Sequence, residues 1–191
     1  MPTSFQGHGL IDIFWDLFYP IVFVIFLWKF KKFLPKIGKD MNLWDLIKII
    51  LILLFLPNVY YAFFEAKHLF ITSQLVDPLN NYSYLVFGSI AVFGLITTVY
   101  SVVTLINHYA KNTTQVLIGL AILCLANGFG ATLGLLELYS WQAITNPFLF
   151  VEKIGEVFST TKYLFIAIIS SIFLYAMTYR CLYLTSNGES K

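Results

Sequence analysis

The chain has 191 residues, of which 59% are hydrophobic and only 12% are charged, and its formal net charge is +2. A typical soluble domain has about 25% charged residues, so this composition, with a mean hydropathy of +0.78, excludes an ordinary soluble domain and predicts a membrane protein. The small positive charge is concentrated in one connection, which argues against nucleic-acid binding.

Five apolar runs follow one another along the chain, at about residues 10–28, 43–64, 82–105, 114–138 and 162–183. Each is long enough to cross a hydrocarbon core of about 30 Å, and a spanning segment must be helical to satisfy its own backbone hydrogen bonds. Asp12 and Asp16 interrupt the first run and no basic stretch precedes it, so we expect a retained span rather than a signal peptide. The sequence therefore predicts an all-α bundle of five transmembrane helices, one domain over residues 1–184, and a disordered tail over 185–191.

Basic residues predict the orientation of this bundle. If the spans alternate, nine of the twelve Lys and Arg residues fall on one side: Lys29, Lys31, Lys32, Lys36, Lys39, Lys48, Lys111, Arg180 and Lys191. The other side has only Lys67, Lys153 and Lys162. Because cytoplasmic connections carry the excess of Lys and Arg, we expect the N-terminus outside and the C-terminus inside, in a cytoplasmic membrane.

The segment between the fourth and fifth runs, residues 139–161, mixes aromatic and charged side chains. This composition predicts an interfacial or re-entrant segment on the outer surface, beginning near Trp141 and broken at Pro147.

Glycines in the fourth run indicate close helix packing. Gly130 and Gly134 form a GxxxG pair, with Gly128 beside them, and small residues let helices approach closely in lipid. The pattern fits packing within the five-helix bundle, and it also fits a homodimer interface.

Polar residues recur near the outer ends of three spans. Asn58, Tyr61, Glu65 and His68 lie three, four and three residues apart, which places them on one helical face, just after Pro57, where a kink is expected. Ionisable groups at membrane depth usually face a bundle interior and mark a site. The sequence thus predicts an outward-facing polar pocket, with these candidates: Asp12, Asp16, Asn58, Tyr61, Glu65, His68, Asn127 and Glu137.

Each candidate also has a local structural explanation. Asp12 and Asp16 could lie at the membrane interface, and Asn58 could compensate for the hydrogen bond that Pro57 removes. Glu65 and His68 could be loop residues. Glu137 could pair with a lysine on the outer surface. These alternatives remain open beside the pocket.

The sequence does not predict a metal site. Glu65-x-x-His68 has the spacing that places carboxylate and imidazole on one side of a helix, but a di-metal bundle needs this motif twice with further carboxylates. Cys124 and Cys181 fit small apolar fillers better than a disulfide or a metal pair. The sequence leaves any cofactor unknown.

Two ordered motifs resemble an uncharacterised bacterial membrane-protein family, domain of unknown function 1361. The first is Phe55-Leu56-Pro57-Asn58 with Tyr61, a following acidic residue and His68-Leu69. The second is Asn127-Gly128-Phe129-Gly130 with Leu133-Gly134, Ser140-Trp141 and Asn146-Pro147. The resemblance covers roughly residues 43–175 and implies an integral membrane protein of bacterial origin without an established activity. It also implies arginines before the Ser-Trp pair, where this chain has Leu135-Leu136-Glu137-Leu138-Tyr139, so we do not expect anion binding there.

Three functions remain open from the sequence. The composition favours a non-enzymatic binding, accessory or assembly protein that works with a membrane-protein partner or a second copy in the lipid bilayer. The second is a small-solute or lipid transporter component, against which stands the absence of a visible inverted repeat. The third is an intramembrane enzyme that uses Glu65 and His68 as acid and base, with Asn58 or Tyr61 orienting the substrate.

Overall fold

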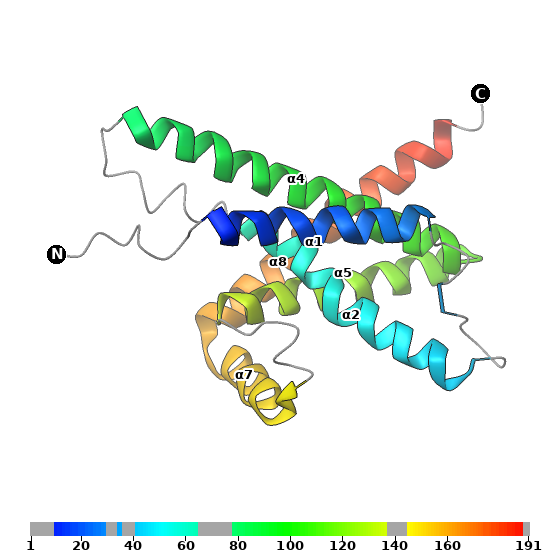
Figure 1. Ribbon diagram of the computed structural model, residues 1–191. Helices are drawn as coiled ribbons and strands as arrows, with labels where there is room; N and C mark the ends of the chain where they lie inside the picture. Colours follow the sequence, from blue (N-terminus) through cyan, green and yellow to red (C-terminus); the bar gives the residue numbers. More distant parts are fainter. Residues whose placement is uncertain (1–9, 30–33, 36–40, 65–77, 137–144, 189–191) are drawn as a thin grey trace.

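The computed structural model describes residues 10–29, 34–35, 41–64, 78–136 and 145–188, with side chains described except at 10–17, 19, 54, 78–87 and 184–188 (Figure 1). Within these residues the chain forms six helices and no strand, which confirms the all-α prediction for this part of the chain. The helices are α1 (Leu10–Lys29), α2 (Leu43–Phe64), α4 (Pro78–Tyr109), α5 (Thr113–Leu135), α7 (Pro147–Ser159) and α8 (Thr161–Gly188).

Four segments are long and apolar enough to cross a membrane: Leu43–Phe64, Gly88–Tyr109, Thr113–Leu135 and Thr161–Tyr183. They correspond to the second to fifth predicted spans. The first predicted span coincides with α1, where the described apolar part is the shorter segment Pro20–Lys29. A fifth span therefore stays a prediction.

Helix α5 packs against α2, α4, α7 and α8, while α1 packs against α2 and α4. Gly130 of α5 lies beside Pro57 of α2, and Gly134 lies beside Tyr61. Because both positions advance by four residues, α2 and α5 run parallel. In the first half of α5, Leu120 and Cys124 share an apolar cluster with Leu174 of α8. Near the end of α5, Leu133 and Leu136 share one with Ala167, which comes earlier in α8. The two helices therefore run antiparallel.

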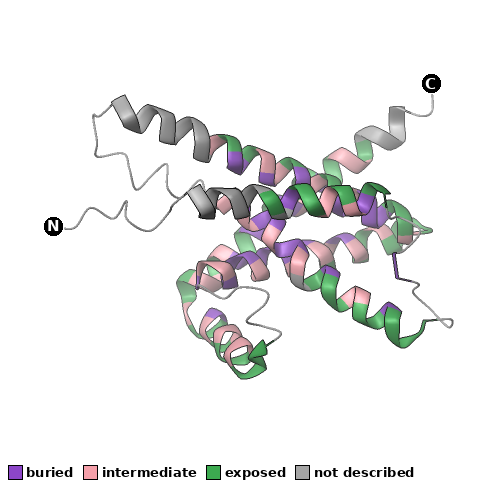
Figure 2. Cartoon of the chain, viewed as in Figure 1, coloured by how far each residue is buried: buried purple, intermediate pink, exposed green. Residues whose placement is uncertain are grey.

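The surface is apolar as well as the interior: exposed positions lie on the outer faces of the helices (Figure 2), and many of them are large and apolar. On α8, Phe165 and Ile172 are exposed while Ser170, Ser171 and Thr178 are buried. The buried polar residues of α4 and α5 are Thr97, Thr98, Ser101, Thr104, Asn127 and Thr132. Soluble proteins mostly expose Ser, Thr and Asn, whereas helix interfaces in lipid are enriched in small and hydroxyl-bearing residues.

Several buried hydroxyls bond to their own helices. Thr98 donates to the carbonyl of Gly94 at 2.6 Å, Thr132 donates to Gly128 at 2.8 Å, and Ser171 donates to Ala167 at 2.6 Å. Bonding to the carbonyl four residues earlier satisfies a hydroxyl without a partner helix. These residues therefore provide compact packing surfaces rather than interhelical hydrogen bonds.

One buried hydroxyl does cross between helices. Tyr60 of α2 is fully buried, and its hydroxyl donates to the backbone carbonyl of Ser170 in α8 at 3.0 Å. A Tyr hydroxyl buried in an apolar interior usually finds such a partner. This bond ties α2 to α8 beside the central helix α5.

Helical structure is interrupted where the sequence predicts a break: Thr145 is helical, Asn146 is not, and α7 begins at Pro147. The side chain of Asn146 accepts from the backbone N–H of Leu149 at 3.2 Å, and proline is favoured at the first helical position because its missing N–H would have no intrahelical partner. The end of α8 differs from its prediction. Helix α8 continues to Gly188, four residues into the segment for which the composition predicts disorder.

Candidate functional site

Three of the eight candidate pocket residues have described side chains: Asn58, Tyr61 and Asn127. Asp12 and Asp16 lie within helix α1, but their side chains are outside the described part. Glu65, His68 and Glu137 lie outside the described residues altogether. The convergence of all eight residues therefore stays a prediction.

Asn58 and Tyr61 are half-buried on α2, which continues as one helix through Pro57. The ring of Tyr61 lies against α5, because a Cβ placed on Gly134 would fall 2.7 Å from its Cδ2 atom. Tyr61 is thus part of the α2–α5 contact. A role in orienting a ligand would have to come from its hydroxyl end rather than from the ring.

Asn127 is the most deeply buried of the three, with 0% of its surface exposed. Its amide nitrogen donates to the carbonyl of Leu123 in the preceding turn at 2.7 Å. Its side-chain oxygen has no hydrogen-bond partner among the described residues, an uncommon state for a buried polar atom. The side chain is enclosed in the bundle and does not line the cavity described below.

The three glycines predicted to mediate packing all lie against other helices of the same chain. A Cβ on Gly128 would fall 2.7 Å from the carbonyl oxygen of Ala167 and 2.9 Å from the backbone nitrogen of Ser171, both in α8. Gly130 and Gly134 instead face Pro57 and Tyr61 of α2. The glycine side of α5 is therefore occupied by intramolecular contacts.

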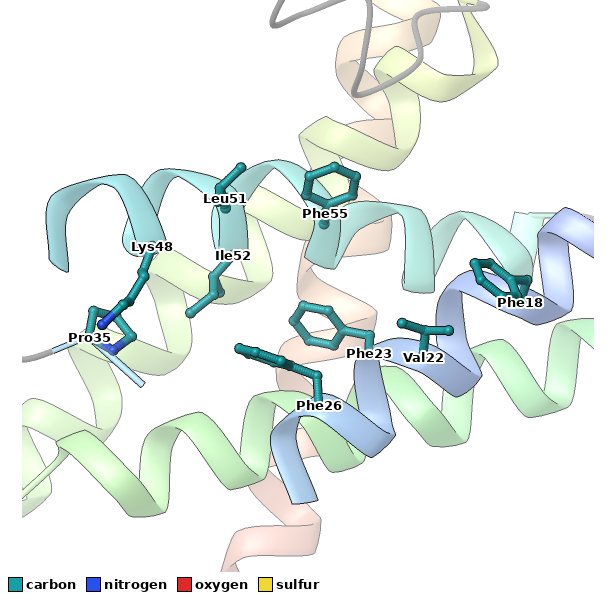
Figure 3. Close-up of a pocket in the computed structure, with 9 residues that line it drawn as sticks. All are labelled: Phe18, Val22, Phe23, Phe26, Pro35, Lys48, Leu51, Ile52 and Phe55. Atoms are coloured by element: carbon teal, nitrogen blue, oxygen red, sulfur yellow. The ribbon is translucent and has the colours of Figure 1, made fainter. Parts of the chain in front are cut away.

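A cavity of about 340 Å³ lies between α1 and α2 (Figure 3), at the low end of the roughly 300–1,000 Å³ typical of small-molecule sites. Its lining residues are Phe18, Val22, Phe23, Phe26, Pro35, Lys48, Leu51, Ile52 and Phe55. Lys48 and Pro35 lie at one end of it and Phe18 at the other, with phenylalanine rings between them (Figure 3). The cavity is thus elongated and almost entirely apolar.

Lys48 belongs to a small polar network at the start of α2. Asn42 precedes the helix, and its side chain accepts from the backbone N–H of Asp45 at 2.9 Å, while the Asp45 carboxylate accepts from the backbone N–H of Asn42 at 3.3 Å. This reciprocal pair caps the helix. The Lys48 ammonium contacts the Asp45 carboxylate at 3.5 Å, so a carboxylate that is only 3% exposed lies beside the lysine at one end of the cavity.

Helix α7 has two unlike apolar faces. Leu149, Phe150, Ile154 and Val157 pack against α5 and α8. On the other side, Phe148 is 87% exposed and Val151 is also exposed, and nothing lies within 4 Å of the position a Cβ on Gly155 would take. Phe158 is partly exposed as well, but its ring contacts Phe129 of α5. Lys153 pairs with Glu156 at 2.8 Å. An exposed apolar stripe beside charged residues is typical of a helix that lies in a membrane interface.

Potential metal ligands do not cluster in the described part of the chain: no three His, Cys, Asp or Glu side chains there could hold one ion. Cys124 and Cys181 are not joined by a disulfide.

Sequence reasoning did not identify the cavity. The available signal was spacing: Phe18, Val22 and Phe26 recur every four residues in α1, and Lys48, Leu51 and Phe55 recur at three and four in α2. Such spacing marks one face of each helix but does not reveal a gap between the faces.

Comparison with known proteins gives one match. A family model described as "Protein of unknown function (DUF1361)" matches residues 15–176, a range that begins within α1 and ends within α8. No curated protein and no solved structure matches the chain.

Proposed function

The chain belongs to the DUF1361 family of proteins of unknown function, and from this membership together with its helical architecture we propose that it is a small, non-enzymatic integral membrane protein. Its role is to bind or assemble with other molecules within the bilayer. We place it in the cytoplasmic membrane of a bacterium, with the N-terminus outside and the C-terminus inside.

The apolar outer surface, with small hydroxyl-bearing residues buried between the helices, is the observation that carries this proposal. Apolar side chains such as Ile96 and Ile172 are exposed, while hydroxyl-bearing residues such as Thr98 and Ser171 are buried. In water such a surface would have to be covered, since monomeric soluble proteins rarely expose large apolar patches. In lipid it is the expected outer surface, and the buried hydroxyls allow close helix packing.

The helix directions support the proposed orientation. Parallel α2 and α5 are what alternating spans require. Lys48, near the start of α2, and Lys111, just before α5, would then lie on one side, the side proposed to be cytoplasmic. Helix α7 then lies on the outer surface, where its exposed side chains Phe148 and Val151 enter the interface.

Cysteine labelling tests this orientation. In a variant lacking Cys124 and Cys181, we expect a cysteine at exposed Glu152 in α7 to react from outside with a membrane-impermeant maleimide. A cysteine at exposed Lys111, between α4 and α5, should react only after the membrane is opened. Reaction of Lys111→Cys in intact cells, or protection of Glu152→Cys, would contradict the orientation, and extraction of the chain by alkaline carbonate would contradict membrane integration.

Substitutions in the predicted outer polar pocket distinguish a binding or assembly protein from an intramembrane enzyme. As a binding or assembly protein, the chain should keep its associated molecules after Glu65→Gln or His68→Ala with only a partial loss of affinity. An enzyme that uses the pair as acid and base should instead lose roughly 10²–10⁴-fold in rate with either change. Native mass spectrometry of gently extracted protein, combined with a cellular phenotype, distinguishes the two outcomes; an abolished phenotype with unchanged association would favour the enzyme.

A further inference from the structure

The cavity between α1 and α2 has the chemistry of a site for a long apolar chain. Eight of its nine described lining residues are apolar, and aromatic rings from both helices form much of its wall. Val22 and Leu51 line it and are 45% and 41% exposed, so it opens outward along the helices. In a membrane this opening faces the acyl chains of the lipid.

Lys48 lies at one end of the cavity and would orient a bound molecule by its charge. Lys48 is the single charged side chain among these lining residues, and five residues from the start of α2 it lies about 8 Å along the helix axis. A lysine at that depth extends its ammonium toward the headgroup region. The ammonium has three N–H donors, of which the contact with Asp45 uses one.

These features fit an amphiphile with an anionic head and an unbranched tail. Apart from Lys48, the described lining offers no polar side chain that would recognise a polar solute inside the cavity. In the sequence, a lysine-rich stretch with Lys29, Lys31, Lys32, Lys36 and Lys39 lies between α1 and α2, and basic clusters beside a span attract anionic lipids. Phospholipid is the amphiphile with which a membrane protein is always in contact.

We propose that this cavity holds one acyl chain of an anionic phospholipid of the inner leaflet, with the lipid phosphate bound by Lys48. The proposal rests on the membrane location and orientation argued above. It assigns a site and a ligand class separate from the outer polar pocket, since none of the pocket candidates is among the described residues that line the cavity.

Native mass spectrometry of delipidated protein tests the site with dioleoyl phosphatidylglycerol and dioleoyl phosphatidylcholine as probes. We expect the first phosphatidylglycerol to bind about fivefold more tightly than phosphatidylcholine, the effect of roughly one basic residue near the membrane surface. Lys48→Gln should remove this preference, whereas Lys162→Gln, which changes an exposed lysine of α8, should keep it. Equal binding of the two lipids by the wild type, or an unchanged preference in Lys48→Gln, would overturn the proposal.

Substitutions that fill the cavity test whether it holds an acyl chain. Leu51→Trp places a large ring in the cavity, while Ile50→Trp changes a neighbouring residue of similar exposure, 48%, that does not line it. We expect Leu51→Trp to weaken both lipids about tenfold, as if about two methylene groups were displaced, and Ile50→Trp to bind like the wild type. Val22→Trp repeats the test from α1 if Leu51→Trp lowers the melting temperature.

Two further outcomes would overturn the proposal: normal lipid binding by folded Leu51→Trp and Val22→Trp, or full competition by millimolar inorganic phosphate, which has no tail. Either result leaves the proposed function intact, because membrane integration and orientation are measured separately by the cysteine labelling.

Discussion

Replacing Gly128 with alanine should destabilise the protein by roughly 2–3 kcal/mol, in the upper part of the range for overpacked interiors. The added methyl group would meet the backbone of α8, at 2.7 Å from the Ala167 oxygen and 2.9 Å from the Ser171 nitrogen. Backbone atoms cannot rotate away as a side chain can, so the two helices must separate. We expect the melting temperature in mild detergent to fall by roughly 5–10 °C.

Gly155→Ala provides the matched control for this substitution. Gly155 is also helical, but nothing lies within 4 Å of the position its Cβ would take. Because alanine is a better helix former than glycine by up to about 1 kcal/mol, we expect Gly155→Ala to leave the melting temperature unchanged or to raise it. A similar loss in both variants would show that helix propensity, and not the α5–α8 contact, determines the effect.

The glycines also show how far packing could be predicted from the sequence. The GxxxG pattern identified Gly128, Gly130 and Gly134, but it passed over Gly94, where a Cβ would fall 2.7 Å from the Cβ of Ala62 and 2.8 Å from the nitrogen of Phe63. Gly94 and Thr98 are four residues apart, so a pattern that admits any small residue would have included them. A sequence pattern does not tell which helix each glycine contacts. Here Gly128 contacts α8, whereas Gly130 and Gly134 contact α2.

Helix boundaries were predictable where they coincide with the limits of the apolar runs. The second run, 43–64, has the bounds of α2. Helix α4 begins at Pro78, before the run that starts near Tyr82, because polar residues such as Asn80 and Asn81 can be helical without belonging to an apolar run. An apolar run marks the part of a helix that lipid can surround, and it does not mark where the helix ends.

The candidate sites were predictable to different degrees. Polar residues stand out in an apolar sequence, so Asn58, Tyr61 and Asn127 were identified at once, although neither the burial of Asn127 nor the contact between Tyr61 and Gly134 could be read from the sequence. Phe23 and Ile52 line the cavity but are ordinary apolar residues. A cavity depends on the separation of two helix faces, which tertiary packing determines.

Placing a carboxylate on the outer face of α8 should have an effect that depends on the surrounding solvent. Ile172 lies halfway along the apolar segment Thr161–Tyr183 and is 61% exposed. If lipid surrounds it, Ile172→Asp should cost roughly 2.5–3.5 kcal/mol, as aspartate does at the centre of a spanning helix. If water surrounded it, a substitution at such an exposed position would usually change stability by only about 0.5 kcal/mol or less.

Thr114→Asp is the control that tests whether the effect of Ile172→Asp depends on depth in the membrane. Thr114 is exposed in the first turn of α5, where a carboxylate also benefits from the positive end of the helix dipole. We therefore expect normal membrane levels and melting temperature for Thr114→Asp, and sharply reduced levels for Ile172→Asp in the same cells. Normal levels of both variants would contradict a lipid-facing α8, because only the hydrocarbon core makes one exposed aspartate so much more costly than the other.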